Sequence, residues 1–325
     1  MKKIILISTG GTIAMRFDQE KQGLVPAVSG AELIEAVPEL SAELPIEVVE
    51  FSNIPSPHMT PRRMLALAKE IDRLAEDESV AGFVITHGTD TVEETAYLLD
   101  LTLTTTKPVC LTAAMRSGGE TSADGPKNIL TAVRTASDSV AGQMGVLVVM
   151  NEEIHAARTV TKTHSANPHA FTSPAWGALG YADEDRIIWR ARPFAREHIA
   201  TDTLAEDVYL VKMATGQDDL LLRCLIEKHV SGIVIEGFGR GNIPPACRSA
   251  IIDAINANIP VVLTTRVHAG RVLDIYGYEG GVADLTQHGI ILAGDLTAQQ
   301  ARLKLMCALA SAKSRDELAR YFANE

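Results

Sequence analysis

The segment Gly82–Thr102, GFVITHGTDTVEETAYLLDLT, contains the structural unit that decides the fold. Its first part, Gly82–Thr86, is a short apolar run typical of a strand buried on both faces, and Thr91–Thr102 has the apolar spacing of a helix. The same alternation continues in both directions. Further predicted strands are Lys3–Ser8, Ile46–Phe51, Pro108–Thr112 and Gly145–Met150, and further predicted helices are Thr60–Glu76 and Gly125–Ser137. The first of these helices opens with Thr60 as N-cap and Pro61 at the first helical position. Buried strands that alternate with helices indicate a parallel sheet covered on both faces.

The alternation stops over Tyr181–Asp207, which has no clean period and which we interpret as strand ends and a linker. It then resumes on a smaller scale. Strands are predicted at Val208–Met213, Gly232–Glu236 and Pro260–Thr265, and helices at Asp219–His229, Pro244–Asn256, Thr297–Ser311 and Lys313–Tyr321. We therefore predict an α/β protein in two parts. A larger N-terminal domain with a doubly wound, mainly parallel sheet spans 1–190, a linker spans 191–207, and a smaller C-terminal α/β domain spans 208–325.

Composition narrows the classes of partner. The 325 residues are 46% apolar and 22% charged, the balance of a globular protein. A net charge of −11 argues against nucleic-acid or anionic-membrane partners, which need many lysines or arginines. The apolar run Ile4–Ile7 is shorter than an export signal uses, and no run is long enough to span a membrane. Four widely spaced cysteines without a CxxC pair predict buried free thiols, no metal site and a reducing, cytoplasmic location.

Ligands of open α/β sheets bind beyond the carboxyl ends of the strands, so the loops there are the places to search for chemistry. The first such loop is Ser8–Ala14, STGGTIA. Its two glycines allow the backbone to approach a ligand closely, and Thr9 and Thr12 present hydroxyls beside them. The motif is neither a dinucleotide fingerprint nor a P-loop. A plain tight turn or an anion-binding turn is the alternative.

A second loop, Thr86–Glu94, follows the neighbouring predicted strand and reads THGTDTVEE. It again places small hydroxyl residues, a glycine and an acid at a strand end. Thr89 or Asp90 could instead serve only as a helix N-cap, which is a common task. We expect His87 to be a hydrogen-bonded structural histidine rather than a catalytic base.

A third segment, Thr159–Thr163, places Lys162 among threonines. An isolated lysine is usually a solvated surface charge. A lysine that is partly desolvated beside a hydroxyl can instead accept a proton. The sequence alone leaves both interpretations open.

Taken together, these motifs resemble those of the bacterial-type L-asparaginases, in the same order and at similar spacing. The matching stretches are TGGTIA at 9–14, HGTDTVEETA at 87–96, AMR at 114–116, SADGP at 122–126, VTKT at 160–163 and GFGRGN at 237–242. The resemblance implies a cytoplasmic amidohydrolase that converts asparagine to aspartate and ammonia, with glutamine or another amide as a side substrate. It implies no metal and no organic cofactor.

The resemblance also assigns roles to residues. Thr12 would attack the amide carbon, and Thr89, Asp90 and Lys162 would form a second catalytic group. The positions that it places at the substrate are Gly11, Ser56, Pro57, Gly88, Ala114, Asn242 and Glu279. Among these, Ser56 would contact the substrate α-carboxylate, while Asn242 and Glu279 would reach the site of a neighbouring subunit in a homodimer or homotetramer. Independently of the family, an alcohol nucleophile needs a base and oxyanion donors, for which the backbone amides of Gly10–Thr12 and Thr89–Asp90 are candidates.

The chain departs from the family pattern at two positions. A mobile loop in the family brings a tyrosine to the nucleophile, but Met15–Ser29 contains no tyrosine and has Leu24 near that place. Pro57 stands where many relatives have a glutamine or glutamate. Three explanations compete for the missing tyrosine. Lys162, together with Thr89 and Asp90, could activate the attack, and this is the explanation that we favour. Tyr276 or Tyr278 of another subunit could instead approach the nucleophile. Alternatively, the enzyme could be slow or could prefer another amide.

Two alternatives to an amidase remain at this point. A non-catalytic or very slow sensor of aspartate or asparagine would bind its ligand without releasing ammonia. A subunit of a tRNA-dependent amidotransferase would carry an extra N-terminal domain and a basic face, and the sequence offers neither. Measuring ammonia release beside calorimetric binding separates the first alternative from an amidase.

Overall fold

A computed structural model describes residues 2–323, apart from the side chains of Pro26, Ser41 and Ala42. The chain divides into two compact units, Met1–His198 and Ile199–Glu325. Each unit is built on its own sheet.

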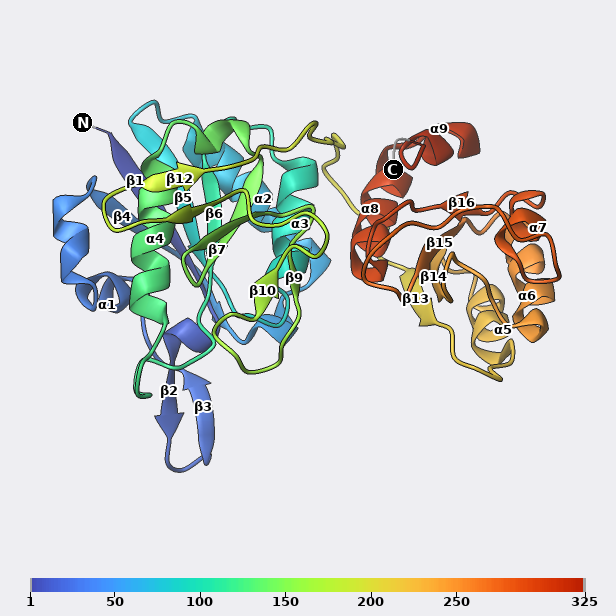
Figure 1. The fold of residues 1–325 in the computed structure, drawn as a ribbon, viewed down its shortest axis with the longest axis horizontal. Coiled ribbons are helices and arrows are strands. Elements are labelled where there is room, and N and C mark those ends of the chain that lie inside the picture. The colour runs from blue at the N-terminus through green and yellow to red at the C-terminus, as the bar shows by residue number, and fades with distance from the viewer. Residues whose placement is uncertain (1, 324–325) are drawn as a thin grey trace. The chain divides into compact units, whose positions relative to one another are not determined.

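In the described part of the N-terminal unit, eight strands form one sheet in the order β12-β11-β8-β7-β6-β5-β1-β4 (Figure 1). The strands are β1 (Lys3–Gly10), β4 (Ile46–Ile54), β5 (Val80–Thr86), β6 (Val109–Thr112), β7 (Val146–Met150), β8 (Glu153–Ala156), β11 (Gly180–Ala182) and β12 (Ile187–Trp189). The first five pair in parallel, whereas β8, β11 and β12 pair antiparallel. The predicted mainly parallel sheet is confirmed. The antiparallel strands were not predicted individually, because each has only three or four residues.

Strand β1 lies inside the sheet, and its side chains alternate between two apolar layers. Ile4 and Leu6 pack in the layer that contains residues of α1 (Gly30–Glu35) and α4 (Gly125–Ser137). Ile5 and Ile7 pack in the opposite layer with residues of α2 (Pro61–Ala75) and α3 (Val92–Thr102). The sheet is therefore covered on both faces, as predicted for a doubly wound domain.

The order of the parallel strands creates a switch point beside β1. The chain passes from β1 to β4 on one side, and then crosses to β5 on the other side. In open α/β sheets ligands bind where the strand order reverses, at the carboxyl ends of the strands. The loops that follow β1 and β5 are therefore the expected place for a site.

Local signals fix the ends of the longer helices. Thr60 caps α2 by accepting a hydrogen bond from the Arg63 amide, and Pro61 occupies the first turn. Both features were predicted. In the C-terminal unit, Thr297 caps α8 and forms a capping box with Gln300.

Several shorter elements of the N-terminal unit were not predicted. The strands β2 (Met15–Asp18) and β3 (Gly23–Pro26) form a hairpin that projects away from the sheet (Figure 1). The strands β9 (Thr161–Lys162) and β10 (Phe171–Thr172) form a second antiparallel pair. The 3-10 helices are η1 (Thr12–Ala14), η2 (Pro38–Ala42), η3 (Ser56–His58) and η4 (Ala141–Gln143). Such short elements depend on their neighbours more than on their own sequence.

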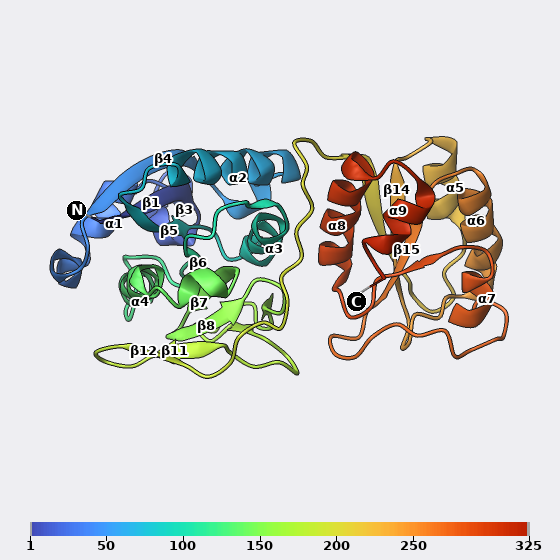
Figure 2. The ribbon, with the colours of Figure 1, turned by 90° about the horizontal axis from the view of Figure 1, so that it is seen from above.

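The C-terminal unit contains a four-stranded parallel sheet in the order β13-β14-β15-β16. Its elements are β13 (Val208–Lys212), α5 (Leu220–Glu227), β14 (Gly232–Gly237), α6 (Pro245–Asn256), β15 (Val261–Thr265), α7 (Val282–Thr286), β16 (Ile291–Leu292), α8 (Ala298–Ser311) and α9 (Arg315–Arg320). Figure 2 shows α8 on one side of β14 and β15, with α5 and α6 on the other. The predicted smaller α/β domain is confirmed.

The prediction of buried free thiols holds for three of the four cysteines. All four are free, and Cys110, Cys247 and Cys307 are buried. Cys224 is exposed, so the prediction was wrong at this position. It lies one helical turn from the exposed Leu220, on the side of α5 that faces away from the buried Leu222. Within residues 2–323 no helix has the length and apolar character needed to cross a bilayer.

Candidate active site

Three of the predicted substrate-contacting residues meet at the switch point of the N-terminal sheet. Gly11 follows β1 with a φ of +84°, and a Cβ atom built on it would overlap the backbone of Gly88. A Cβ atom on Gly88 would in turn lie 2.6 Å from Oγ of Ser56. The loops after β1, β4 and β5 are therefore packed against one another with no room for a side chain at either glycine.

Thr12 begins the 3-10 helix η1 directly after Gly11, and its side chain is half-buried. The other threonine of this loop has a different role. Thr9 is buried and donates a hydrogen bond to the carbonyl of Thr86, 2.8 Å away. It therefore ties the end of β1 to the end of β5, whereas Thr12 is the threonine that the family resemblance proposes as nucleophile.

Lys162 joins Thr89 and Asp90. Its Nζ atom lies 3.0 Å from Oγ1 of Thr89 and 2.8 Å from Oδ1 of Asp90. The Lys162 side chain is mostly buried, whereas that of Asp90 is 60% exposed. The Lys162 ammonium group thus lies between the buried Thr89 hydroxyl and the Asp90 carboxylate. The exposed part of that carboxylate can bind a second cation.

The position of Lys162 depends on contacts of its backbone. Its amide donates to Oε2 of Glu93, the second residue of α3, at 2.6 Å. In the register of β9 and β10, Lys162 pairs with Phe171, which is buried. Helix α3 and strand β10 therefore hold the backbone of the residue whose side chain reaches the turn after β5.

Ser56 organises the same turn. The Asp90 amide donates to Oγ of Ser56 at 3.2 Å, and the Thr91 hydroxyl donates to the Ser56 carbonyl at 2.8 Å. The neighbouring Pro57 is exposed in η3 and offers no side-chain hydrogen bond.

Two backbone amides proposed as oxyanion donors are engaged within the protein. The Gly11 amide donates to the Ile54 carbonyl at 3.0 Å, and the Asp90 amide donates to Ser56. Both therefore leave the set of candidates. The other amides of the two turns, Thr12 and Thr89 among them, stay candidates.

The loop that contains Ala114 follows β6, and side chains at the start of α4 hold it in place. Asp124 accepts hydrogen bonds from the amides of Met115, at 3.0 Å, and Arg116, at 2.9 Å. The buried Asn128 donates to the Ala113 carbonyl at 2.9 Å. Sequence reasoning assigned no role to Asp124 or Asn128; the SADGP motif was the available signal for the first.

His87 is a structural residue, as predicted. It is fully buried, with Nδ1 2.9 Å from the Gly88 carbonyl and Nε2 3.0 Å from the Thr95 hydroxyl. Burial lowers its pKa to about 4, so the ring is neutral near pH 7. The neutral ring donates from Nδ1 and accepts at Nε2, which fixes the peptide of Gly88.

Asn242 and Glu279 lie in the C-terminal unit, whereas the other predicted site residues lie in the N-terminal unit. The Asn242 backbone is held by Phe238, and its side-chain Oδ1 is buried with no hydrogen-bond partner in the described part of the chain. Glu279 is exposed. Over the described residues, no group of three or more His, Cys, Asp or Glu side chains is arranged to hold a metal ion.

Comparison with known proteins identifies the family of the chain. The family model for the N-terminal asparaginase domain matches residues 3–195, and the model for the glutaminase/asparaginase C-terminal domain matches residues 207–322. The chain belongs to the asparaginase family.

Relatives match this family member along nearly its whole length. The L-asparaginase of Bacillus licheniformis is 38% identical, covering 96% of this chain and 97% of that protein. The glutaminase-asparaginase of Acinetobacter glutaminasificans is 32% identical, over 99% of each chain. The crystal structure of a probable cytoplasmic L-asparaginase from Campylobacter jejuni superposes with a TM-score of 0.88 at 34% identity, covering 99% of each chain.

Proposed function

We propose that this asparaginase-family protein hydrolyses the side-chain amide of L-asparagine to L-aspartate and ammonia, with Thr12 as the nucleophile. The observation that carries the proposal is the position of Lys162 Nζ, within hydrogen-bond distance of both Thr89 and Asp90. Relatives named L-asparaginase, similar over the full length of the chain, support the same reaction.

The chemistry divides between the two threonines. A threonine hydroxyl is a weak nucleophile at neutral pH and needs a group that takes its proton. Lys162 in its amine form would take that proton by way of the Thr89 hydroxyl, 3.0 Å from Nζ, while Asp90 keeps Nζ in place. Thr12 would form an ester with the substrate acyl group, the proton would leave with ammonia, and water would then hydrolyse the ester.

Substrate recognition follows from the groups around Thr12. The exposed side of the Asp90 carboxylate can bind the substrate α-amino group. Ser56 Oγ accepts a hydrogen bond from the Asp90 amide, so its own proton can be donated to the substrate α-carboxylate. Pro57 offers no side-chain hydrogen bond. The substrate α-amino group therefore has fewer partners than in relatives with a glutamine or glutamate at this position. A relative named glutaminase-asparaginase supports glutamine as a second, slower substrate.

The hairpin β2–β3 would act by excluding water. Phe17 and Leu24 pair across the hairpin, and both side chains are apolar and exposed. Neither side chain can accept a proton. We therefore assign proton transfer to Lys162 and not to this pair.

The side chain of Asn242 supports an oligomeric protein. The buried Oδ1 of Asn242 has no hydrogen-bond partner among the residues that the structure describes, and a buried acceptor without a partner is costly. A neighbouring subunit that receives Asn242 and Glu279 at its own site would account for it, in a homodimer or homotetramer.

Similarity to the probable cytoplasmic L-asparaginase of Campylobacter jejuni supports a cytoplasmic location.

An ammonia-release assay tests the reaction. We expect the wild-type protein to release ammonia from L-asparagine, and the Thr12→Ala and Thr89→Val variants to lose that release while still binding aspartate in calorimetry. Binding of aspartate or asparagine without turnover by the wild-type protein would favour the sensor. Turnover by Thr12→Ala equal to that of the wild type would remove Thr12 from the mechanism.

A further inference from the structure

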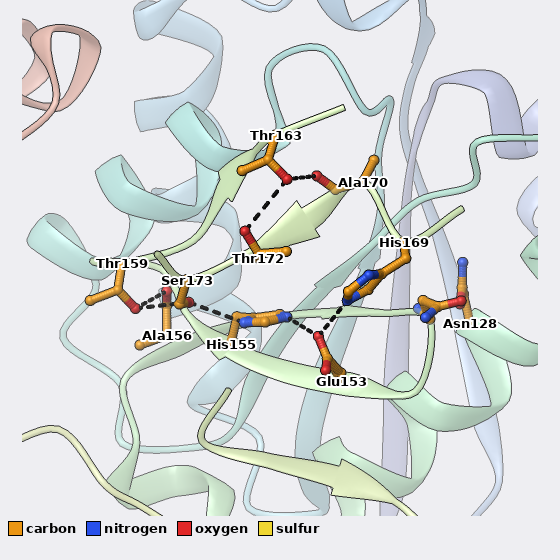
Figure 3. A network of polar contacts seen from close by, with 11 residues as sticks. Asn128, Glu153, His155, Ala156, Thr159, Thr163, His169, Ala170, Thr172 and Ser173 are labelled. Atoms are coloured by element: carbon orange, nitrogen blue, oxygen red, sulfur yellow. Dashed lines mark hydrogen bonds and ion pairs between the residues drawn. The ribbon is translucent and has the colours of Figure 1, made fainter. Parts of the chain in front are cut away.

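A cluster of polar side chains lies beneath the strand pair that carries Lys162. We call it the β10 clamp and define it as Glu153, His155, Thr159, His169 and Ser173. Figure 3 shows the Glu153 carboxylate between the rings of His155 and His169, and Ser173 on the far side of His155. The family comparison and the proposed reaction give these residues no role.

The contacts of the clamp form a chain of hydrogen bonds. The Thr159 hydroxyl can donate to Oγ of Ser173 at 3.1 Å or to the Ala156 carbonyl at 3.5 Å, and Oγ of Ser173 lies 3.0 Å from Nδ1 of His155. Ser173 can therefore donate to Nδ1, which places the ring proton of a neutral His155 on Nε2. Nε2 lies 3.2 Å from Oε2 of Glu153 without the alignment of a hydrogen bond, and Nε2 of His169 lies 3.1 Å from the same oxygen.

The clamp holds β10 at both of its ends. His169 lies two residues before the strand, and Ser173 follows it directly. Glu153 and His155 belong to β8, which is part of the central sheet. The two ends of β10 are thus fixed to the rigid body of the N-terminal unit.

Strand β10 passes this restraint on to Lys162. Phe171 pairs with Lys162, and the Thr163 amide donates to the Ala170 carbonyl at 2.7 Å. A two-stranded pair is marginally stable by itself, and each of these strands has two residues. Anchors outside the pair therefore keep the backbone of Lys162 where its Nζ reaches Thr89: Glu93 holds the Lys162 amide, and the clamp holds β10.

Burial of His155 and Ser173 within the clamp is costly unless these two residues serve such a purpose. His155 is 1% exposed and Ser173 is 5% exposed, and burial lowers the pKa of His155 despite the nearby Glu153. Apolar side chains would fill the same space without polar groups to satisfy. A polar cluster instead fixes one geometry through directional bonds.

We propose that Glu153, His155 and Ser173, together with His169, are positioning residues that hold β9 so that Lys162 meets Thr89 and Asp90. This inference rests on the proposed function, because it gives Lys162 a catalytic task. The residues of the clamp do not touch the substrate; they act through β10.

A first experiment reads the position of the strand without any activity. Amide hydrogen exchange over residues 159–173 is compared in the wild type, His169→Ala and His169→Gln. His169 is half exposed, so both variants should fold, and the glutamine amide can still donate to Glu153. We expect faster exchange at the Thr163 amide in His169→Ala, by about tenfold or more, and wild-type exchange in His169→Gln. Equal exchange in all three proteins overturns the inference.

A second experiment is a double-mutant cycle on turnover. Ser173→Ala should lower kcat by about 10- to 100-fold with KM changed less than about threefold, because a displacement of the base of about 1 Å is enough for such a loss. In the Lys162→Met background the same substitution should cost nothing further, since the group being positioned is gone. The exposed His198 supplies a matched control, as His198→Ala changes a histidine outside the clamp. Losses that multiply in both backgrounds would show a general structural defect and overturn the inference.

The two experiments separate failure of the inference from failure of the proposed function. If the wild-type protein releases no ammonia from any amino-acid amide, the proposed function fails, while hydrogen exchange still decides whether the clamp holds β9. If turnover is present and Ser173→Ala does not fold, His169→Ala replaces it in the cycle, with His169→Gln as the variant expected to restore kcat.

Discussion

A Cβ atom added to Gly88 would lie 2.6 Å from Oγ of Ser56, so these two residues are packed with no space for a methyl group. Ser56 also receives the Asp90 amide, and any shift of the turn after β5 would move Asp90. The glycine is therefore a requirement of the site as well as of the turn.

The Gly88→Ala variant should lose activity because the turn and Ser56 must move apart. We expect kcat/KM for asparagine to fall by about 100-fold or more, since small displacements of catalytic groups are expensive. Gly118→Ala is the control, because a Cβ atom there meets nothing within 4 Å. Wild-type kcat/KM in Gly88→Ala would mean that the turn can shift without harm.

Replacement of Lys162 should separate its charge from its proton transfer. Lys162→Met removes the amine and is expected to lower kcat by about 10²–10⁴, the usual loss for a general base. Lys162→Arg keeps a cation beside Asp90 but cannot release a proton near pH 7, so it should be similarly slow while keeping stability closer to the wild type. Steady-state kinetics and thermal unfolding of both variants check this. An active Lys162→Arg enzyme would contradict the role of Lys162 as base.

The hairpin should tolerate change far better than Lys162 does. Leu24 is 41% exposed and pairs with Phe17, so Leu24→Ala removes apolar cover without removing a reacting group. We expect kcat to fall less than about tenfold, well below the 10²–10⁴ typical of a lost general base. A loss as large as that of Lys162→Met would instead place a catalytic task in the hairpin.

His87 should make the fold less stable in acid. Its pKa is about 4 in the folded protein, because burial disfavours the charged ring, and about 6.5 in the unfolded chain. Between these values the unfolded state binds more protons, so the stability from this group is fully present above about pH 6.5 and falls as the pH approaches 4.

Urea unfolding at pH 7.5 and pH 4 measures this effect, with His87→Gln as a variant that cannot titrate. The difference in unfolding free energy between the wild type and the variant should shrink by about 3 kcal/mol over that range. Every other titrating group is common to both proteins. A difference that stays constant with pH would mean that the pKa of His87 is the same in the folded and the unfolded protein.

Sequence reasoning predicted the long elements and missed the short ones for a physical reason. The helix after Thr60 was found from a cap, a proline and an apolar period, all of which lie within the segment itself. Strands β9 and β10 have two residues each, and they exist only because Lys162 and Phe171 pair with each other. No local pattern encodes such a pairing.

The candidate site likewise contains residues that a local pattern indicates and contacts that depend on distant segments. Thr12, Thr89 and Asp90 could be proposed from strand-end loops, and their catalytic roles stay predictions. The contact of Lys162 with Asp90 spans 72 residues, and only the motif resemblance suggested it. Asp124 and Asn128 were missed because they contribute hydrogen bonds to the backbone of another loop. The identity of a residue does not indicate that it makes such bonds.

The order of strands around β1 has a consequence for how the protein acquires activity as it folds. The residues at the switch point come from the ends of β1, β4 and β5, and Ser8 of β1 is matched with Glu50 on one side and Thr86 on the other. Parallel pairings between distant segments form slowly, because long loops must close first. Recovery of ammonia release during refolding would therefore report when the first strand enters between its two neighbours. Helix formation, which is local and faster, should precede it.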